Sequence, residues 1–154
     1  MLERLLPSGQ SQWSVHPAAL WLLGVVAVLK AVIGFNSVVF TRTVAAGADG
    51  LPLDRMSPEA AAGLMRTFAI LGTWQISAAL LCAAVLIRYR HLVGPTCLLL
   101  LLQQIAARFV GAPLSTAVFA NTPGFWINML QLVLLISVLV ISLRGVSRAG
   151  PLGV

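Results

Sequence analysis

The residues that could do chemistry in this chain are polar side chains set within long apolar runs. Lys30 falls near the middle of the first run, and no Asp or Glu lies in any run to pair with it. A charge at the centre of a lipid bilayer, the environment that such runs indicate, costs about 2.5–3.5 kcal/mol on insertion scales. The alternatives are extension to the headgroups, loss of the proton, hydrogen bonds to Ser, Thr, Asn or Gln across the bundle, or an acid or ligand from outside.

A second group of polar residues consists of amides inside the runs and arginines at their ends. Such a set could hold the head of an anionic or carbonyl-bearing amphiphile, for example a phospholipid, a fatty acid or a quinone. The alternative is that the amides join helices by hydrogen bonds of about 0.6 kcal/mol each while the arginines extend to the headgroups. Trp74 could line the same pocket or pack in the core. The candidate ligand-binding residues are Lys30, Asn36, Arg42, Arg66, Trp74, Gln104, Arg108, Asn128 and Gln131.

Other kinds of site lack their residues in the sequence. His16 and His91 fall at the ends of the runs, where they cannot ligate a haem between helices, and the runs hold no carboxylate for a proton relay or a di-metal site. Cys82 and Cys97 form no C-x-x-C motif and are expected to be buried free thiols, although a hairpin could bring them to one depth. The sequence predicts no catalytic residue, no metal site and no cofactor beyond a lipid or quinone.

Composition identifies the solvent that surrounds these residues. Of the 154 residues, 59% are hydrophobic and only 9% are charged. A soluble domain carries about a quarter charged residues, so the chain is expected to be surrounded mainly by lipid. The net charge of +6 comes from cations placed singly at the edges of the runs. Anionic headgroups would balance such cations, and nucleic acid is not expected as a partner.

Four apolar runs are long enough to cross about 30 Å of hydrocarbon at about 1.5 Å per residue. Ser57 and Pro58 have the pattern of a helix start, so the second helix is expected to begin near 58, and Thr122 starts the fourth in the same way. Residues 88–91 are too few for anything but an antiparallel hairpin. We therefore predict one all-α domain over 1–154, an integral membrane four-helix bundle of up-down-up-down topology. Its spans are expected at about 18–41, 67–87, 92–110 and 125–143.

Antiparallel spans fix the depth of each polar residue. We call the side of the first and third connections the far face, and the side of the termini and the second connection the near face. At about 1.5 Å per residue, Asn36, Gln104 and Gln131 lie about 8–9 Å below the far face, and Asn128 about 5 Å. Gln104 and Arg108 share one face of the third helix, being one turn apart. The polar side chains are thus expected to gather in the far half.

Orientation follows from the positive-inside rule. Five arginines are assigned to the near face and four to the far face, which predicts that both termini lie in the cytoplasm, although the flanks of the first helix alone argue for the reverse. The expected location of this multi-pass protein is the bacterial inner membrane. The near-face residues are Arg4, Arg88, Arg90, Arg144 and Arg148, and the far-face residues are Arg42, Arg55, Arg66 and Arg108.

Two strings resemble small four-helix membrane proteins. RTF at 66–68 leads through GTW at 72–74 into the second span, and ARFVGAP at 107–113 ends the third. The chain resembles the DoxX-like superfamily over about 20–143 and, more faintly, the membrane scaffold family of sterol biosynthesis. The scaffold family has His and Glu in its third helix where this chain has QQIAA at 103–107, and AIL at 69–71 interrupts the first string. The resemblance implies a non-enzymatic protein that holds partner enzymes, or a binder of hydrophobic ligands.

Residues and resemblance lead to one expectation for function and one alternative. The expectation is a non-catalytic accessory or scaffold subunit of a membrane complex, holding a lipid or a quinone-like amphiphile in its far half. Its partners would be membrane lipids and other integral membrane subunits or further copies of itself. The alternative is a small carrier or a membrane enzyme that acts on an amphiphile in the same pocket.

Overall fold

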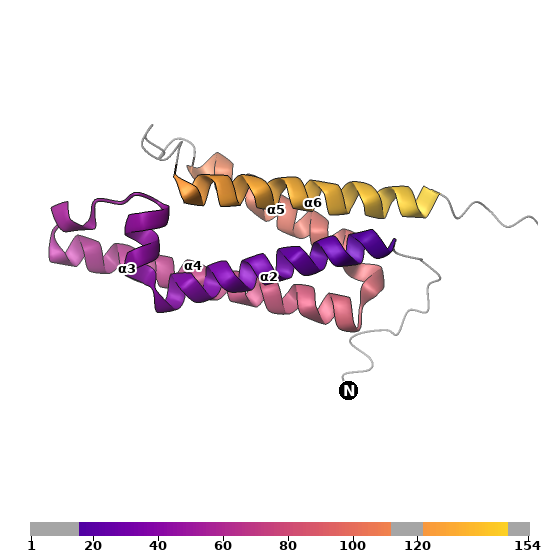
Figure 1. Cartoon of the computed structure of the whole chain (residues 1–154), viewed down its shortest axis with the longest axis horizontal. Helices are drawn as coiled ribbons and strands as arrows, with labels where there is room; N and C mark the ends of the chain where they lie inside the picture. Colours follow the sequence, from indigo (N-terminus) through magenta and orange to yellow (C-terminus); the bar gives the residue numbers. More distant parts are fainter. Residues whose placement is uncertain (1–15, 112–121, 148–154) are drawn as a thin grey trace, which may run out of the picture.

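The structure, a computed structural model, describes residues 16–111 and 122–147. Four long helices form this part of the chain (Figure 1): α2 (Pro17–Val39), α4 (Pro58–Ile87), α5 (Val93–Gly111) and α6 (Pro123–Ser147). Each contains a stretch that is long and apolar enough to cross a membrane. The predicted all-α four-helix membrane bundle is confirmed, and the chain is an integral, multi-pass membrane protein.

The helix starts depend on local capping. Ser57 and Thr122 each accept a hydrogen bond through the side-chain oxygen from the backbone N–H three residues later, at 3.3 Å. A proline follows each cap as the first helical residue, where its missing N–H costs nothing. Both starts were predicted. The sequence analysis missed the cap of α2, where Nδ1 of His16 accepts from the backbone N–H of Ala18 at 3.2 Å.

The side-by-side order of the helices differs from their order in the chain. α2 packs most extensively against α4 and next against α6, while α5 packs mainly against α6. α4 and α5 are joined by the short turn η3 (Arg90–Leu92), yet they make few contacts beyond it. In Figure 1, α5 runs from its hairpin with α4 to the first turns of α6, at the opposite end of the bundle. The α2–α4 contact is therefore the most extensive in the bundle, and α6 packs against both α2 and α5.

The apolar core lies in the near half of the bundle. Ala19, Leu23 and Val26 are fully buried at helical spacing on one face of α2. The same cluster contains Cys82 of α4 and Cys97 of α5. Both cysteines are free and buried, as predicted. The cluster is completed by Ala78, Val85, Val93, Leu100, Leu135 and Val138, which leaves the far half to be held by other contacts.

One such contact is a close crossing of α2 and α4. A Cβ atom built on Gly34 would lie 2.7 Å from the carbonyl oxygen of Gly72, and one built on Gly72 would lie 2.8 Å from the carbonyl oxygen of Gly34. Small residues at the contact allow two backbones to approach in a membrane, where packing rather than hydrophobicity drives association. The glycine pair thus fixes the α2–α4 distance.

Short turns connect α2 to α4 at the far face. They are α3 (Thr41–Thr43), the π-helical turn η1 (Val44–Ala48) and the 3-10 turn η2 (Leu53–Arg55). Gly50 adopts a φ of +68°, which glycine accepts without strain. Next to it, the carboxylate of Asp49 approaches Gly124 in the first turn of α6 so closely that a side chain at Gly124 would collide with it. The first connection therefore packs against the start of α6.

This contact predicts a pH dependence. Burial raises the pKa of Asp49 above its usual value, so the folded chain holds the proton more tightly than the unfolded chain does. Stability contributed by Asp49 should therefore fall as the pH rises from about 3.9 through the raised pKa. In detergent, Asp49→Asn should melt at an equal or higher temperature than the parent at pH 7, and the difference should shrink towards pH 4. A lower melting temperature for Asp49→Asn at pH 7 would mean that the dipole of α6 outweighs burial.

Candidate functional site

Three of the predicted amides meet between α5 and α6 in the far half. Nε2 of Gln104 lies 3.4 Å from both the backbone oxygen and Oδ1 of Asn128, and 3.5 Å from Oε1 of Gln131. These are long hydrogen bonds, so each is weak. Asn128 also donates from Nδ2 to the carbonyl oxygen of Gly124 at 2.9 Å. We call Gln104, Asn128 and Gln131 the amide cluster.

A pocket opens beside the amide cluster and next to Arg108. It encloses about 250 Å³ and is lined by Gln104, Ala107, Arg108, Phe125 and Asn128. We call it the Arg108 pocket. It joins the last turns of α5 to the first turns of α6, so it lies at the far face, where the depth count had put these residues.

Two donors at this site have no acceptor in the part of the chain that the structure describes. They are Nε of Arg108, which is a buried atom, and Nε2 of Gln131, whose residue is fully buried. A buried N–H without a partner costs about 1–3 kcal/mol, and more for a charged group. Natural proteins satisfy most such groups, and an acceptor from outside the described chain would satisfy these.

Lys30 does not join this cluster. It is 1% exposed, on the face of α2 that packs against α4, and its Nζ donates to Oε1 of Gln75 at 2.8 Å. Of the alternatives that the sequence left open for Lys30, the structure therefore shows a hydrogen bond to a glutamine across the bundle. The Lys30–Gln75 bond joins the same two helices as the glycine crossing, a turn nearer the middle of the span.

The remaining predicted residues lie outside both groups. Arg42 forms an exposed ion pair with Asp54, with Nη2 and Oδ1 2.9 Å apart. Arg66 is exposed on α4, and Asn36 is half-buried on α2. Trp74 is 61% exposed, so it faces outward and neither packs in the core nor lines the Arg108 pocket. The nine candidate residues thus do not form one site.

The sequence analysis missed Gln75 as the partner of Lys30 and Phe125 as a wall of the Arg108 pocket. The depth count could have identified Gln75. Gln75 lies nine residues from Arg66 and Lys30 lies eleven residues from Thr41, and both Arg66 and Thr41 are at the far face. These separations correspond to about 14 Å and 16 Å from the far face. No comparable signal exists for Phe125, because depth alone does not tell which way an aromatic residue points.

The chemistry of the α5–α6 site is that of hydrogen-bond donors and one fixed positive charge. Amides and a guanidinium are neither nucleophiles nor bases at ordinary pH, but they bind carboxylate, phosphate and carbonyl oxygens well. Within residues 16–111 and 122–147, no group of three or more His, Cys, Asp or Glu side chains could hold a metal ion.

Comparison with known proteins adds no relative. The chain matches no protein-family model, and no curated protein or solved structure is significantly similar to it. The resemblance to the DoxX-like and sterol-scaffold families therefore stays a prediction.

Proposed function

We propose that this chain is a non-catalytic accessory or scaffold subunit of a membrane assembly, and that it holds the polar head of an amphiphile in the Arg108 pocket. The observation that carries the proposal is Nε of Arg108, a buried donor in the wall of this pocket without an acceptor in the described chain. The amphiphile would supply this acceptor as an oxygen of a phosphate, a carboxylate or a quinone. Its tail would lie in the surrounding hydrocarbon.

The pocket geometry supports a head rather than a whole molecule. Its volume of about 250 Å³ is below the 300–1,000 Å³ that is usual for drug-sized ligands. Phe125 and Ala107 supply its apolar walls, and the polar groups come from one side chain of α6 and two of α5. A carbonyl or an anionic group fits this arrangement, with the rest of the ligand outside.

The packing of the helices indicates where a protein partner of an accessory subunit would bind. α4 packs mainly on α2, which leaves Ile70, Leu71 and Trp74 exposed along its outer face. The hydroxyls of Thr73 and Ser77 on this side bond to carbonyl oxygens of their own helix, at 3.0 Å each. These two hydroxyls therefore need no hydrogen-bond acceptor from another chain. A partner would bind this face by shape and apolar contact.

Ligand binding can be tested by removing the charge of the pocket. Arg108→Met should weaken binding of the retained amphiphile about 10- to 100-fold, since a hydrogen bond from a charged group contributes about 1.5–3 kcal/mol. The probes are phosphatidylglycerol, a long-chain fatty acid and a short-tailed benzoquinone, each titrated into the delipidated full chain and followed by native mass spectrometry. Arg55→Met is the matched control, because Arg55 is an exposed arginine at the same face.

The same spectra separate the two functions. An accessory subunit extracted in mild detergent should keep protein partners as well as its ligand, whereas a carrier should keep the ligand alone and exchange it quickly with added amphiphile. Unchanged binding of all three probes by Arg108→Met would contradict the pocket. Extraction as a lone chain, with rapid exchange, would contradict the accessory role.

A further inference from the structure

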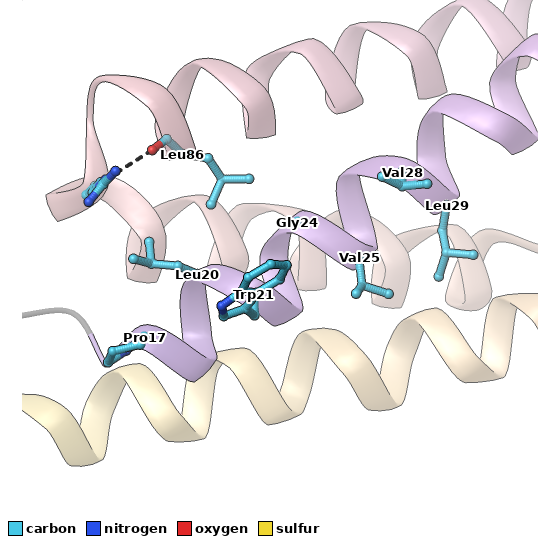
Figure 2. Close-up of a pocket in the computed structure, with 9 residues that line it drawn as sticks. Pro17, Leu20, Trp21, Gly24, Val25, Val28, Leu29 and Leu86 are labelled. Carbon is cyan, nitrogen blue, oxygen red and sulfur yellow. Dashed lines mark hydrogen bonds between the residues drawn. The ribbon is translucent and has the colours of Figure 1, made fainter.

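A larger groove lies at the opposite end of the bundle from the Arg108 pocket. It encloses about 630 Å³ between the first half of α2 and the end of α4 (Figure 2). Its walls include Leu20, Trp21, Val28 and Leu86, and its single charged lining residue in the described chain is Arg90. We call it the near groove. No residue of the candidate ligand site lines it.

Gly24 of α2 lies in the wall of the near groove. Figure 2 shows Gly24 between Trp21 and Val28 along α2, with Leu86 of α4 directed towards it. A Cβ atom on Gly24 would lie 3.9 Å from Cδ1 of Leu86, which is ordinary contact. Alanine would therefore fit, whereas a leucine at this position would extend into the groove and fill part of it.

The length of the near groove corresponds to one leaflet. Its lining on α2 extends from Pro17, the first residue of the helix, to Leu29. The twelve helical steps from Pro17 to Leu29 span about 18 Å, and half of a hydrocarbon core of about 30 Å is about 15 Å. A groove of this length and apolar lining fits an acyl chain that runs from the near face to the middle of the bilayer.

The charge at the mouth of the near groove determines the kind of head. Nε of Arg90 donates to the carbonyl oxygen of Leu86 at 3.2 Å, shown by the dashed line in Figure 2, which orients the guanidinium while its terminal N–H groups stay available. Arg88 adds a second exposed positive charge on the same hairpin. In the part of the chain that the structure describes, the acids are Asp49, Asp54 and Glu59, all at the far end.

Trp21 indicates the level of the membrane surface at the groove. Its side chain is 80% exposed although it is large and aromatic. Tryptophan is enriched at the boundary between hydrocarbon and headgroups, where its ring lies in apolar surroundings and its N–H reaches polar groups. Trp21 is one turn inside the start of α2, so the guanidinium of Arg90 at the hairpin is at headgroup depth.

We propose that the near groove binds an anionic phospholipid of the near leaflet, with one acyl chain along Gly24 and Val28 and the phosphate at Arg90. The apolar lining, the one-leaflet length and the arginines, which have no acid near them in the described chain, favour a lipid with a negative head over a zwitterionic one. This site is separate from the Arg108 pocket in position and in residues.

The test compares phosphatidylglycerol with phosphatidylcholine of the same acyl chains. The full chain in mild detergent is offered an equimolar mixture, and the bound lipids are counted by native mass spectrometry. Gly24→Leu should remove one tightly held lipid, and Arg90→Gln should lower the preference for phosphatidylglycerol about fivefold, the effect of one arginine near an anionic surface. Gly24→Ala, which leaves the groove open, should behave as the parent.

Controls separate this proposal from misfolding and from the proposed function. Gly94→Leu adds the same side chain near the same face at a glycine with open space around it, and Arg55→Gln removes an arginine at the far face. Arg108→Met should keep the lipid of the near groove. The proposal is overturned if Gly24→Leu retains as many lipids as the parent, if Arg90→Gln keeps the parent preference, or if Gly24→Leu instead changes the oligomeric state with lipid retention unchanged.

Discussion

Gly34→Ala is expected to destabilise the bundle by about 3 kcal/mol, the upper part of the range for overpacking. The added methyl group would lie 2.7 Å from the carbonyl oxygen of Gly72 and 2.9 Å from the backbone nitrogen of Ile76. Backbone atoms of a helix cannot turn aside as a flexible side chain can, so α2 and α4 must separate. A longer side chain, as in Gly34→Leu, should prevent the pair from forming.

The matched control for this prediction is Gly63→Ala on α4. Nothing lies within 4 Å of a Cβ atom at Gly63, so only the helix propensity changes, which should stabilise the chain by up to about 1 kcal/mol. Stability is measured as the melting temperature and the resistance to denaturing detergent of the purified chain. Equal stability of Gly34→Ala and Gly63→Ala would show that the two helices tolerate a wider crossing. Gly72→Ala should reproduce the effect of Gly34→Ala, since its added methyl group would meet the Gly34 carbonyl oxygen at 2.8 Å.

The second large effect is expected at the Lys30–Gln75 bond. Gln75→Leu removes the acceptor of the 2.8 Å bond and leaves a lysine that is 1% exposed without a partner in the described chain. Removing the partner of a buried charge costs about 3–5 kcal/mol, because the remaining charge is neither solvated nor bonded. Lys30→Met, in contrast, removes the costly group and keeps most of its volume, so its stability should equal or exceed that of the parent.

Combining the two substitutions completes a double-mutant cycle between positions 30 and 75. Lys30→Met combined with Gln75→Leu should recover most of the stability that Gln75→Leu loses, giving a coupling of at least about 2 kcal/mol between the two positions. The cycle is measured by reversible unfolding in mixed micelles. Additive effects would contradict a direct bond between the two side chains. A Lys30→Met chain that folds but loses a protein partner would give the lysine an additional role outside the bundle.

Lys30 illustrates how a sequence can pose a question that only packing answers. Its position, the absence of an acid in its span and the cost of its burial were all readable from the chain. The depth count also brings Gln75 within about 3 Å of its level. The choice of Gln75 over the far-half amides depended on α2 packing with α4, which the spacing of residues along one helix does not specify.

The amide cluster is the complementary case. Gln104, Asn128 and Gln131 were expected to gather in the far half of the bundle, and they do meet there. The same depth argument included Asn36, Arg42 and Arg66, which the structure puts elsewhere. Depth along the bundle does not choose among these residues, and the direction around the helix axis decided which of them became neighbours.

The sequence by itself determined the membrane class, the four spans, their up-down order and the starts of α4 and α6. These depend on local physics: apolar length against bilayer thickness, and capping by Ser57 and Thr122 within one turn. The tertiary structure alone decided that α2 packs on α4 and that α6 packs on α2 and α5, and it decided the partner of Lys30 and the two pockets. A hydrocarbon solvent is equally favourable to every apolar face of a helix, so it does not determine which helices pack together. Two glycines allow α2 and α4 to approach closely, and amide side chains join α5 to α6 by hydrogen bonds.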